Sequence, residues 1–331
     1  MIRSKSHSML APALRQRRFP LLGTLALALV LGAQGLAQAQ APSQARTTVR
    51  VAYIPVVTWL PFLVAREKGY FDKNGIDVAM TRFPNIVNLP QALGKQFDIV
   101  PTTAPDFLNA VGSGVNIVAV AGESLETSAN KSFLLMVRND GSVNTLRDLE
   151  GKRVASPGIG SVMHVALLYA IRKEGGDPSK VIGVEVPFPA MADQLKAGRV
   201  DAVEQLEPFA GQMLQRGFKS LGAPLLAIAD PVLFPFWIAD AEWARANRGV
   251  IRRWIASLEE GLAFIRTDER EARAILARLS GLPEAVVAAV PIPEFNFRIA
   301  PAQLDVWRNV LVSQGRPLAG LDMNRLVVSG D

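Results

Sequence analysis

Two glycines and a serine precede a long apolar segment near the middle of the chain. Gly158 and Gly160 permit a tight backbone turn, and Ser161 stands where a helix N-cap belongs. Free backbone N–H groups at such a helix start, together with the helix dipole, favour an anionic group. The spacing is not that of a P-loop. It indicates either an anion-binding turn or a serine that simply caps its helix.

Histidine and cysteine, which often carry catalysis or bind metals, are scarce in this sequence. The chain has two histidines, His7 and His164, and no cysteine; His7 falls in an N-terminal segment that we expect to be removed. One histidine cannot complete a Ser-His-Asp triad or a metal cluster. The carboxylates of Glu204 and Glu207 lack the supporting pattern of a glycosidase. The sequence therefore predicts a protein that binds a ligand and is not an enzyme, with no cofactor and no metal.

The first 39 residues have the order of a secretory signal. Arg15, Arg17 and Arg18 precede the apolar run LLGTLALALVLG, and the small-residue site Ala37-Gln38-Ala39 ends the segment. A membrane anchor needs about 20 apolar residues, and this run is shorter. We therefore expect residues 1–39 to be a cleaved signal peptide. Arg17-Arg18-Phe19 is a weak twin-arginine signal, so the export route stays open.

Removal of that segment changes the charge of the protein. It holds five basic residues and no acidic ones, so the formal charge of +6 falls to +1. A nearly neutral chain without basic blocks has no electrostatic footprint for nucleic acid. Without cysteine there is no lipid anchor after the signal. We expect a freely diffusing monomer in the periplasm.

Strand-like and helix-like runs alternate along the remaining chain. Strands are predicted at 49–54, 76–81, 97–102 and 116–123, and helices at 62–68, 89–96 and 105–114. Gly69 is expected to end the first helix. This alternation predicts an α/β fold with a mainly parallel sheet covered by helices on both faces.

The second half of the sequence repeats the first at an offset of 103 residues. Arg50-Val51-Ala52 recurs as Arg153-Val154-Ala155, and Asp98 recurs as Asp201. Gln91, Val100 and Pro105 recur at the same offset as Gln194, Val203 and Pro208. The repeat predicts two α/β lobes of similar design.

Two apolar runs are placed to carry the chain between the lobes. Residues 132–140 (SFLLMVRND) carry it over, and residues 232–240 (VLFPFWIAD) carry it back. Beyond them, residues 249–281 read as a pair of amphipathic helices and residues 301–312 as a last helix. The lobes are therefore expected to be joined by two crossovers.

Ligands of parallel α/β sheets bind beyond the carboxyl ends of the strands. In the first lobe this rule selects residues 55–59, 83–85 and 102–104; in the second it selects 157–163 and 205–207. Trp59 could lie flat against a ligand or pack in the core. The predicted ligand-binding residues are Trp59, Asn85, Thr102, Thr103, Gly160, Ser161, Val162, Gln205 and Glu207.

Three ordered motifs carry a family resemblance. LVAREKGYFDKNGIDV, DLEGKRVASPGIGSVMH and AGRVDAVEQLEPFAG resemble the solute-binding proteins of nitrate, sulfonate and taurine ABC importers, over a range from about Val49 to past Pro291. The resemblance implies a two-lobed periplasmic binding protein type II clamshell. Lobe one would comprise residues 48–135 and 238–331, and lobe two residues 136–237.

The same resemblance implies which positions line the cleft. They are the loop after the first strand, Thr102-Thr103, the Gly160-Ser161 turn and the acid before Pro208, which here is Glu207. The sequence departs from the family at Leu206, where Trp is frequent, and at Glu204, where a small or apolar residue is usual. A second acid near the site would favour a ligand with an amine or another donor.

The implied function is capture of a small, anionic organic solute of the sulfonate, nitrate or taurine class. Its partners would be the small-molecule ligand and an ABC permease and ATPase complex at the inner membrane. Two alternatives remain: a binder of a thiamine-pyrimidine-like precursor, or an enzyme on the same scaffold. The sequence does not show whether the protein also presents its ligand to a chemoreceptor or a sensor kinase.

Overall fold

The computed structural model describes residues 46–83 and 89–328. The predicted signal peptide, 1–39, and the predicted ligand contact Asn85 lie outside these described residues. The described residues all belong to one compact unit. Among the described residues, no helix has both the length and the apolarity that a membrane crossing requires.

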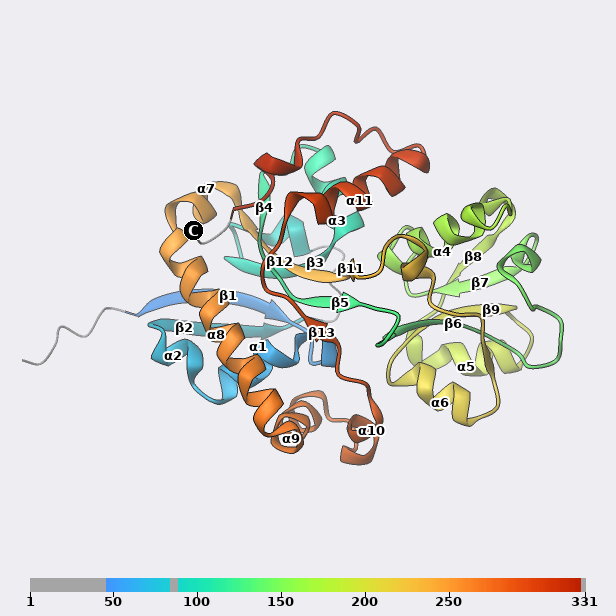
Figure 1. The fold of residues 1–331 in the computed structure, drawn as a ribbon, viewed down its shortest axis with the longest axis horizontal. Helices are drawn as coiled ribbons and strands as arrows, with labels where there is room; N and C mark the ends of the chain where they lie inside the picture. Colours follow the sequence, from blue (N-terminus) through green and yellow to red (C-terminus); the bar gives the residue numbers. More distant parts are fainter. Residues whose placement is uncertain (1–45, 84–88, 329–331) are drawn as a thin grey trace, which may run out of the picture. The chain divides into compact units, whose positions relative to one another are not determined.

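A first five-stranded sheet joins four strands from the first part of the described chain with one strand from beyond residue 234 (Figure 1). Its order is β2 (Ile76–Arg82), β1 (Thr47–Tyr53), β3 (Ile99–Thr103), β12 (Pro235–Asp240) and β4 (Ile117–Gly122). The pairs β1–β2 and β1–β3 are parallel, and β12 runs antiparallel between β3 and β4. The sheet is therefore mainly parallel, with one reversed strand.

Helices cover the first sheet on both faces. One face packs against α1 (Leu60–Glu67), α2 (Tyr70–Lys73), α8 (Arg248–Thr267) and α9 (Glu269–Ser280). The other packs against α3 (Ala104–Gly112) and α11 (Pro301–Ser313). The short helices α7 (Ala241–Ala246) and α10 (Glu284–Ala289) complete this part.

A second five-stranded sheet has the order β10 (Lys219–Ser220), β6 (Phe133–Val137), β9 (Ala202–Leu206), β7 (Arg153–Ser156) and β8 (Ile182–Glu185). Here β6 is the reversed strand. One face packs against α4 (Val162–Lys173), and the other against α5 (Phe188–Lys196) and α6 (Phe209–Gln215). Both sheets are therefore helix-covered layers, which confirms the α/β fold class.

The strand register of the first sheet recurs in the second at the offset of 103. Val51 pairs with Ile99 in the first sheet, and Val154 pairs with Ala202 in the second. Hydrogen bonds recur as well: the backbone N–H of Arg50 donates to Asp98 Oδ2 at 2.8 Å, and that of Arg153 donates to Asp201 Oδ2 at 2.9 Å. The sequence repeat is therefore a repeat of structure.

A third, short sheet joins segments that are distant in the chain. Its order is β11 (Val232–Leu233), β5 (Ser124–Glu126) and β13 (Glu294–Phe295), all antiparallel. The apolar run 232–240 is divided at Phe234 into β11 and β12, which lie in different sheets. The chain therefore passes between the two large sheets twice, near β5 and near β11, and β13 adds a third segment at this point.

Local sequence explains most of the helix boundaries. Pro61 lies in the first turn of α1, and Gly69, at φ 72°, follows its end, as expected from the sequence. The helix expected at 89–96 was wrong, because the structure has a 3-10 turn at Leu89–Ala92. Pro90 lies within that turn, and Gly94 takes a positive φ of 73° soon after it. The chain therefore leaves the helical conformation early.

Candidate functional site

The loop after β1 meets the segment after β9 around a small cavity. Pro55, Val56 and Val57 line it from one side, and Glu207 and Pro208 from another. Its volume is about 20 Å³, roughly the space of one water molecule. The remaining lining side chains are apolar and come from the end of α9 onward: Leu276, Leu282, Val287 and Val290. The two loops selected by the sheet-edge rule therefore come together here.

Glu207 is the one charged side chain of this lining, and it already has a protein partner. Its Oε2 atom accepts the backbone N–H of Gly211 in the first turn of α6, at 3.1 Å. Burial raises the pKa of Glu207, and the bond from Gly211 lowers it by less. The carboxyl group is therefore placed at the cavity wall by a backbone donor.

The Gly160-Ser161 turn precedes α4, as the sequence predicts. Gly160 has a φ of 82°, and a Cβ there would meet nothing within 4 Å. Ser161 occupies the N-cap position, but its side chain makes no capping bond, so the simple capping interpretation is wrong. Its Oγ atom is buried and has no hydrogen-bond partner among the described residues. A buried hydroxyl without a partner is unusual and has an unused donor and acceptor.

Val162 follows Ser161 as the first residue of α4. Its side chain is 6% exposed and belongs to a hydrophobic cluster with Phe133, Leu233 and Trp307. Its side chain therefore packs in the core, and the expected ligand contact of Val162 stays a prediction.

Thr102 and Thr103 end β3 and are both buried. The hydroxyl of Thr103 donates to Asp106 Oδ2 at 2.7 Å, while that of Thr102 makes a long contact of 3.4 Å with the carbonyl of Thr103. Burial raises the pKa of Asp106 to about 6, and the Thr103 bond opposes the shift. Thr103 thus has an internal partner before any ligand arrives.

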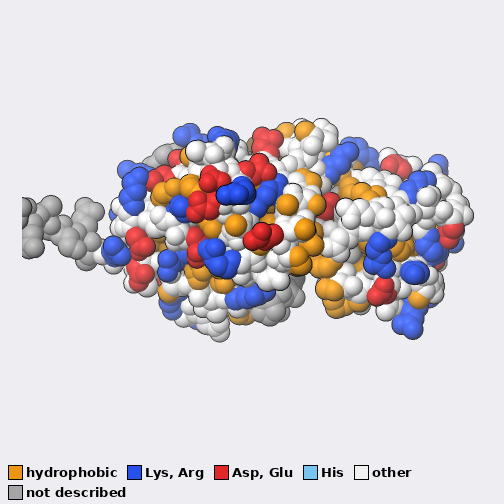
Figure 2. Space-filling model, turned by 90° about the horizontal axis from the view of Figure 1, so that it is seen from below, with side chains coloured by type: hydrophobic (Ala, Val, Ile, Leu, Met, Phe, Trp, Pro, Cys, Tyr) orange, Lys and Arg blue, Asp and Glu red, His pale blue; other side chains and the backbone are white. Residues whose placement is uncertain are grey.

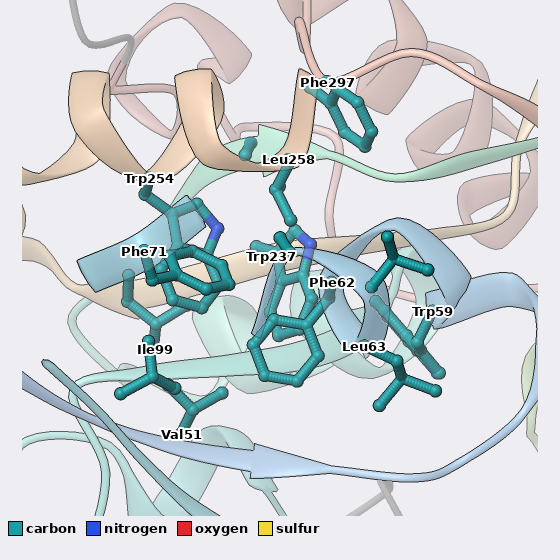
Figure 3. Close-up of a cluster of buried hydrophobic side chains, with 14 of the residues drawn as sticks. Val51, Trp59, Phe62, Leu63, Phe71, Ile99, Trp237, Trp254, Leu258 and Phe297 are labelled. Carbon is teal, nitrogen blue, oxygen red and sulfur yellow. The ribbon is translucent and has the colours of Figure 1, made fainter. Parts of the chain in front are cut away.

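Trp59 packs in the hydrophobic core rather than offering a free ring face (Figure 3). It is 3% exposed, and its ring lies edge-on to that of Trp237, with centroids 4.8 Å apart. Trp237 continues the aromatic cluster to Phe62 and Trp254. The stacking role expected for Trp59 is corrected to a core role, because the 3-10 turn at Val57–Trp59 directs this side chain beneath the loop.

The side chain of Gln205 is also buried, and it is hydrogen-bonded within the protein. Its amide donates to the carbonyl of Phe188 at 3.2 Å, and its Oε1 accepts the N–H of Leu206 at 3.1 Å. Successive strand residues point to opposite faces, and helices cover both faces of this sheet. The amide of Gln205 therefore joins β9 to the start of α5, and its ligand contact stays a prediction.

The structure adds two buried carboxyl groups that the sequence analysis missed. Glu123 follows β4 and accepts the Nε1–H of Trp237, while its Oε1 has no partner among the described residues. Glu126 accepts the backbone N–H groups of Ser132 and Phe133 and the Ser132 hydroxyl. Their signal was two glutamates within the apolar run VAVAGESLE. Burial is the main cause that raises the pKa of each.

A third buried carboxyl, Glu204, faces the histidine of α4. Its side chain is fully buried, and its Oε1 lies 3.4 Å from Nδ1 of His164. Burial raises the pKa of Glu204, and His164 and Ser156 lower it by less. Within the described ranges, the fully buried charged side chains are these glutamates, with no buried Lys or Arg.

Surface charges of both signs alternate over the face shown in Figure 2. Examples of exposed pairs are Arg278 with Glu67 at 2.5 Å and Lys73 with Glu260 at 2.6 Å. No grouping of three or more His, Asp or Glu side chains suited to a metal ion occurs in the part of the chain that the structure describes. This face has no continuous basic patch of the kind that binds nucleic acid.

Sequence comparison places the chain among known proteins. A family model described as NMT1/THI5 like matches residues 57–272. A protein of Escherichia coli that carries the name of an aliphatic sulfonates-binding protein is 29% identical over 203 residues, which cover 60% of this chain and 58% of that protein. The riboflavin-binding protein RibY of Chloroflexus aurantiacus is 21% identical over 82% of this chain and 76% of its own. The chain therefore spans between half and two thirds of the first relative.

Solved structures share the fold. The periplasmic aliphatic sulphonate binding protein SsuA from Escherichia coli superimposes with a TM-score of 0.70 at 21% identity, covering 85% of this chain and 92% of that one. The nitrate-binding protein NrtA from Synechocystis gives 0.64 at 13% identity, covering 86% and 92%. These relatives and neighbours are named as binding proteins. The similarities confirm the family resemblance and the periplasmic binding protein fold.

Proposed function

This chain belongs to the NMT1/THI5-like family, and from that premise we propose that it is the periplasmic substrate-binding component of an ABC importer. It captures a small, anionic organic solute of the sulfonate, nitrate or taurine class and delivers it to a permease and ATPase complex. The protein acts as a monomer and without catalysis. Named relatives that bind sulfonates support the ligand class.

The observation that carries this proposal is the start of α4. Ser161 Oγ is buried without a partner, directly after the open turn at Gly160. Helix N-termini favour anions through free N–H groups and the dipole. A ligand anion at this position would give the Ser161 hydroxyl the partner it lacks. A dissociation constant of about 1 μM corresponds to roughly 8 kcal/mol, which a few charge-assisted hydrogen bonds can supply.

Closure around the ligand would use the three-stranded sheet as the hinge. In this proposal the two large sheets are the cores of lobe one (48–135 and 238–331) and lobe two (136–237). The cavity at Glu207 is about 20 Å³, so a ligand needs the lobes to separate before it enters. Hinge closure of this kind buries small ligands between two domains.

A thermal-shift screen tests the function directly. The panel contains taurine, ethanesulfonate, nitrate, riboflavin and an aminopyrimidine, because the relatives and the remaining alternatives name these chemistries. A ligand at 100 times its Kd adds about 2.7 kcal/mol to the free energy of unfolding. Stabilisation by a sulfonate or nitrate supports the proposal. Stabilisation by riboflavin or the aminopyrimidine alone would replace the ligand class, and product formation from any of them would contradict the binding-only function.

A further inference from the structure

His164 and Glu204 form a buried pair under the start of α4. Their side chains are 8% and 0% exposed, and His164 Nδ1 lies 3.4 Å from Glu204 Oε1. His164 is the third residue of α4, and Glu204 is the third residue of β9. Gly183 of β8 leaves room for the ring, because a Cβ there would lie 3.2 Å from His164 Cε1. The pair is therefore enclosed by one helix and the sheet beneath it.

Neither partner has a well-formed hydrogen bond elsewhere. Nδ1 of His164 and both carboxyl oxygens of Glu204 are buried and lack a conventional hydrogen bond among the described residues. An ionised carboxylate in such a place is costly unless a proton or a cation compensates it. Imidazole is the side chain that ordinarily changes charge between pH 5 and 8. The pair is thus suited to take up a proton as the pH falls.

The sign of the resulting charge change is the same whichever partner receives the proton. Protonation of either group raises the net charge of the pair by one, because coupled groups titrate as a unit. His164 follows Ser161 by three residues, so the pair lies one helical turn from the proposed anion site. A more positive pair attracts an anion at that helix start more strongly.

Neighbouring groups on the other strands complete the charge environment. Glu185, the last residue of β8, accepts the N–H of Ile159 at 3.0 Å. Ser156 of β7 donates its hydroxyl to the carbonyl of Gly158 at 2.9 Å. Both hold the loop before α4. Among the charged groups named here, Glu185 and Glu204 are acidic, so proton uptake by the pair makes their combined charge less negative by one.

We propose that the His164–Glu204 pair regulates the anion site by proton uptake, so that affinity for an anionic solute rises as the pH falls. The inference rests on the proposed function. It gives a role to His164 and to Glu204, which stands where the family usually has a small or apolar residue. With one added charge about one helical turn away, we expect a change of roughly 3- to 10-fold in affinity.

The test uses ethanesulfonate and nitrate, which keep a single negative charge from pH 5 to 9. Dissociation constants are measured at pH 8 and pH 6 for the wild type, for the double variant His164→Gln/Glu204→Gln, and for Glu174→Gln. Glu174 lies exposed at the opposite end of α4 and is the matched control. The wild type and the control should bind 3- to 10-fold more tightly at pH 6, and the double variant should lose most of this change.

The measurements distinguish a failure of the pH regulation from a failure of anion binding itself. If the double variant keeps the full wild-type pH dependence, the pair does not regulate the site although the binding function stands. If wild-type protein binds neither anion at either pH, the anionic function fails and the inference fails with it. Folding of each variant is checked by its melting temperature before binding is measured.

A second measurement needs no ligand. Proton NMR follows the imidazole resonances from pH 5 to 9, and His164→Gln identifies the signal of His164. Glu204→Gln should change the pH dependence of these resonances, because the two groups titrate as a unit. Resonances that show no pH dependence in this range, or an identical pH dependence in Glu204→Gln, would overturn the proposal.

Discussion

Glu207 and Gly211 are joined by a hydrogen bond of 3.1 Å from the Gly211 N–H to Glu207 Oε2. This bond orients a half-buried carboxyl group at the wall of the small cavity. Burial nevertheless raises the pKa of Glu207 above its ordinary value. The net effect of the folded environment is therefore to penalise the ionised form.

For Glu207→Gln we expect the ligand-free protein at pH 8 to be as stable as the wild type or more stable. The raised pKa means that ionised Glu207 lowers the stability of the folded protein. This cost is fully present at pH values above the folded pKa, and it disappears once the pH falls below the ordinary pKa of a glutamate. The wild type should therefore gain stability relative to the variant between pH 8 and pH 4. Urea unfolding at both pH values measures this difference, with exposed Glu174→Gln as control. A variant that is clearly less stable at pH 8 would mean that the Gly211 bond outweighs burial.

Ser161→Ala should leave the free energy of unfolding within about 0.5 kcal/mol of the wild type, because no capping bond is lost. Affinity for the anion identified in the thermal-shift screen should fall by about 10-fold, the value of one typical hydrogen bond. Ser132→Ala is the matched control, since its hydroxyl donates to Glu126 at 2.5 Å and its loss should destabilise by about 1.5 to 3 kcal/mol. Unchanged affinity in Ser161→Ala would remove Ser161 from the binding site.

Trp59→Ala should destabilise the protein by about 3 to 5 kcal/mol, because it opens a cavity beside Trp237. Trp59→Phe should recover much of this loss. Chemical denaturation measures both, and Trp243→Ala, on the half-buried Trp243 of α7, provides a milder comparison. If Trp59→Ala instead weakened ligand binding while stability stayed near the wild-type value, the core role would be wrong.

The carboxyl group of Asp106 should make stability depend on pH. Its pKa of about 6 in the folded protein, against 3.8 ordinarily, means that the ionised form is penalised above pH 6 and the penalty disappears below 3.8. Relative to Asp106→Asn, the wild type should gain up to about 3 kcal/mol between pH 8 and pH 4. Thr103→Val removes the opposing bond and should raise the pKa of Asp106 further. An equal pH dependence in wild type and Asp106→Asn would contradict this assignment.

Gly261→Ala should destabilise the contact between α1 and α8 by about 1 to 3 kcal/mol. A Cβ at Gly261 would lie 2.3 Å from the carbonyl oxygen of Pro61, which is rigid backbone. Gly249→Ala in the same helix is the control, because its nearest neighbour is an arginine side chain at 4.0 Å, and it should be neutral or stabilising. Equal effects of the two changes would show that helix propensity, rather than close packing, decides at Gly261.

Sequence periodicity predicted the elements well where one local rule governs them. Gly69 ends the first helix as expected, and the pair α8 and α9 matches the amphipathic segment 249–281. The 103-residue repeat predicted two similar sheets, and the recurring pairs Val51–Ile99 and Val154–Ala202 confirm it. The lobe boundaries stay predictions.

The contacts that individual side chains make were harder to predict than the helices and strands. The edge rule selected Trp59 and Gln205 but could not say that one enters an aromatic core and that the other, within β9, bonds to Phe188. Ser161 was correctly placed at the helix start, yet the missing capping bond depends on its rotamer. The buried glutamates Glu123 and Glu126 were missed because their partners lie in other segments or across a turn. Tertiary packing decided each case.

The position of β12 between β3 and β4 imposes an order on folding. All strands of the second sheet lie within residues 133–220, so its contacts can form as soon as that contiguous stretch of chain is available. The first sheet stays interrupted until residues 235–240 arrive, and β3 and β4 have open edges until then. Contacts that close long loops form slowly, and open strand edges are prone to aggregation. Although it is encoded first, the first sheet should be the last to complete and the one most dependent on protection while the chain emerges.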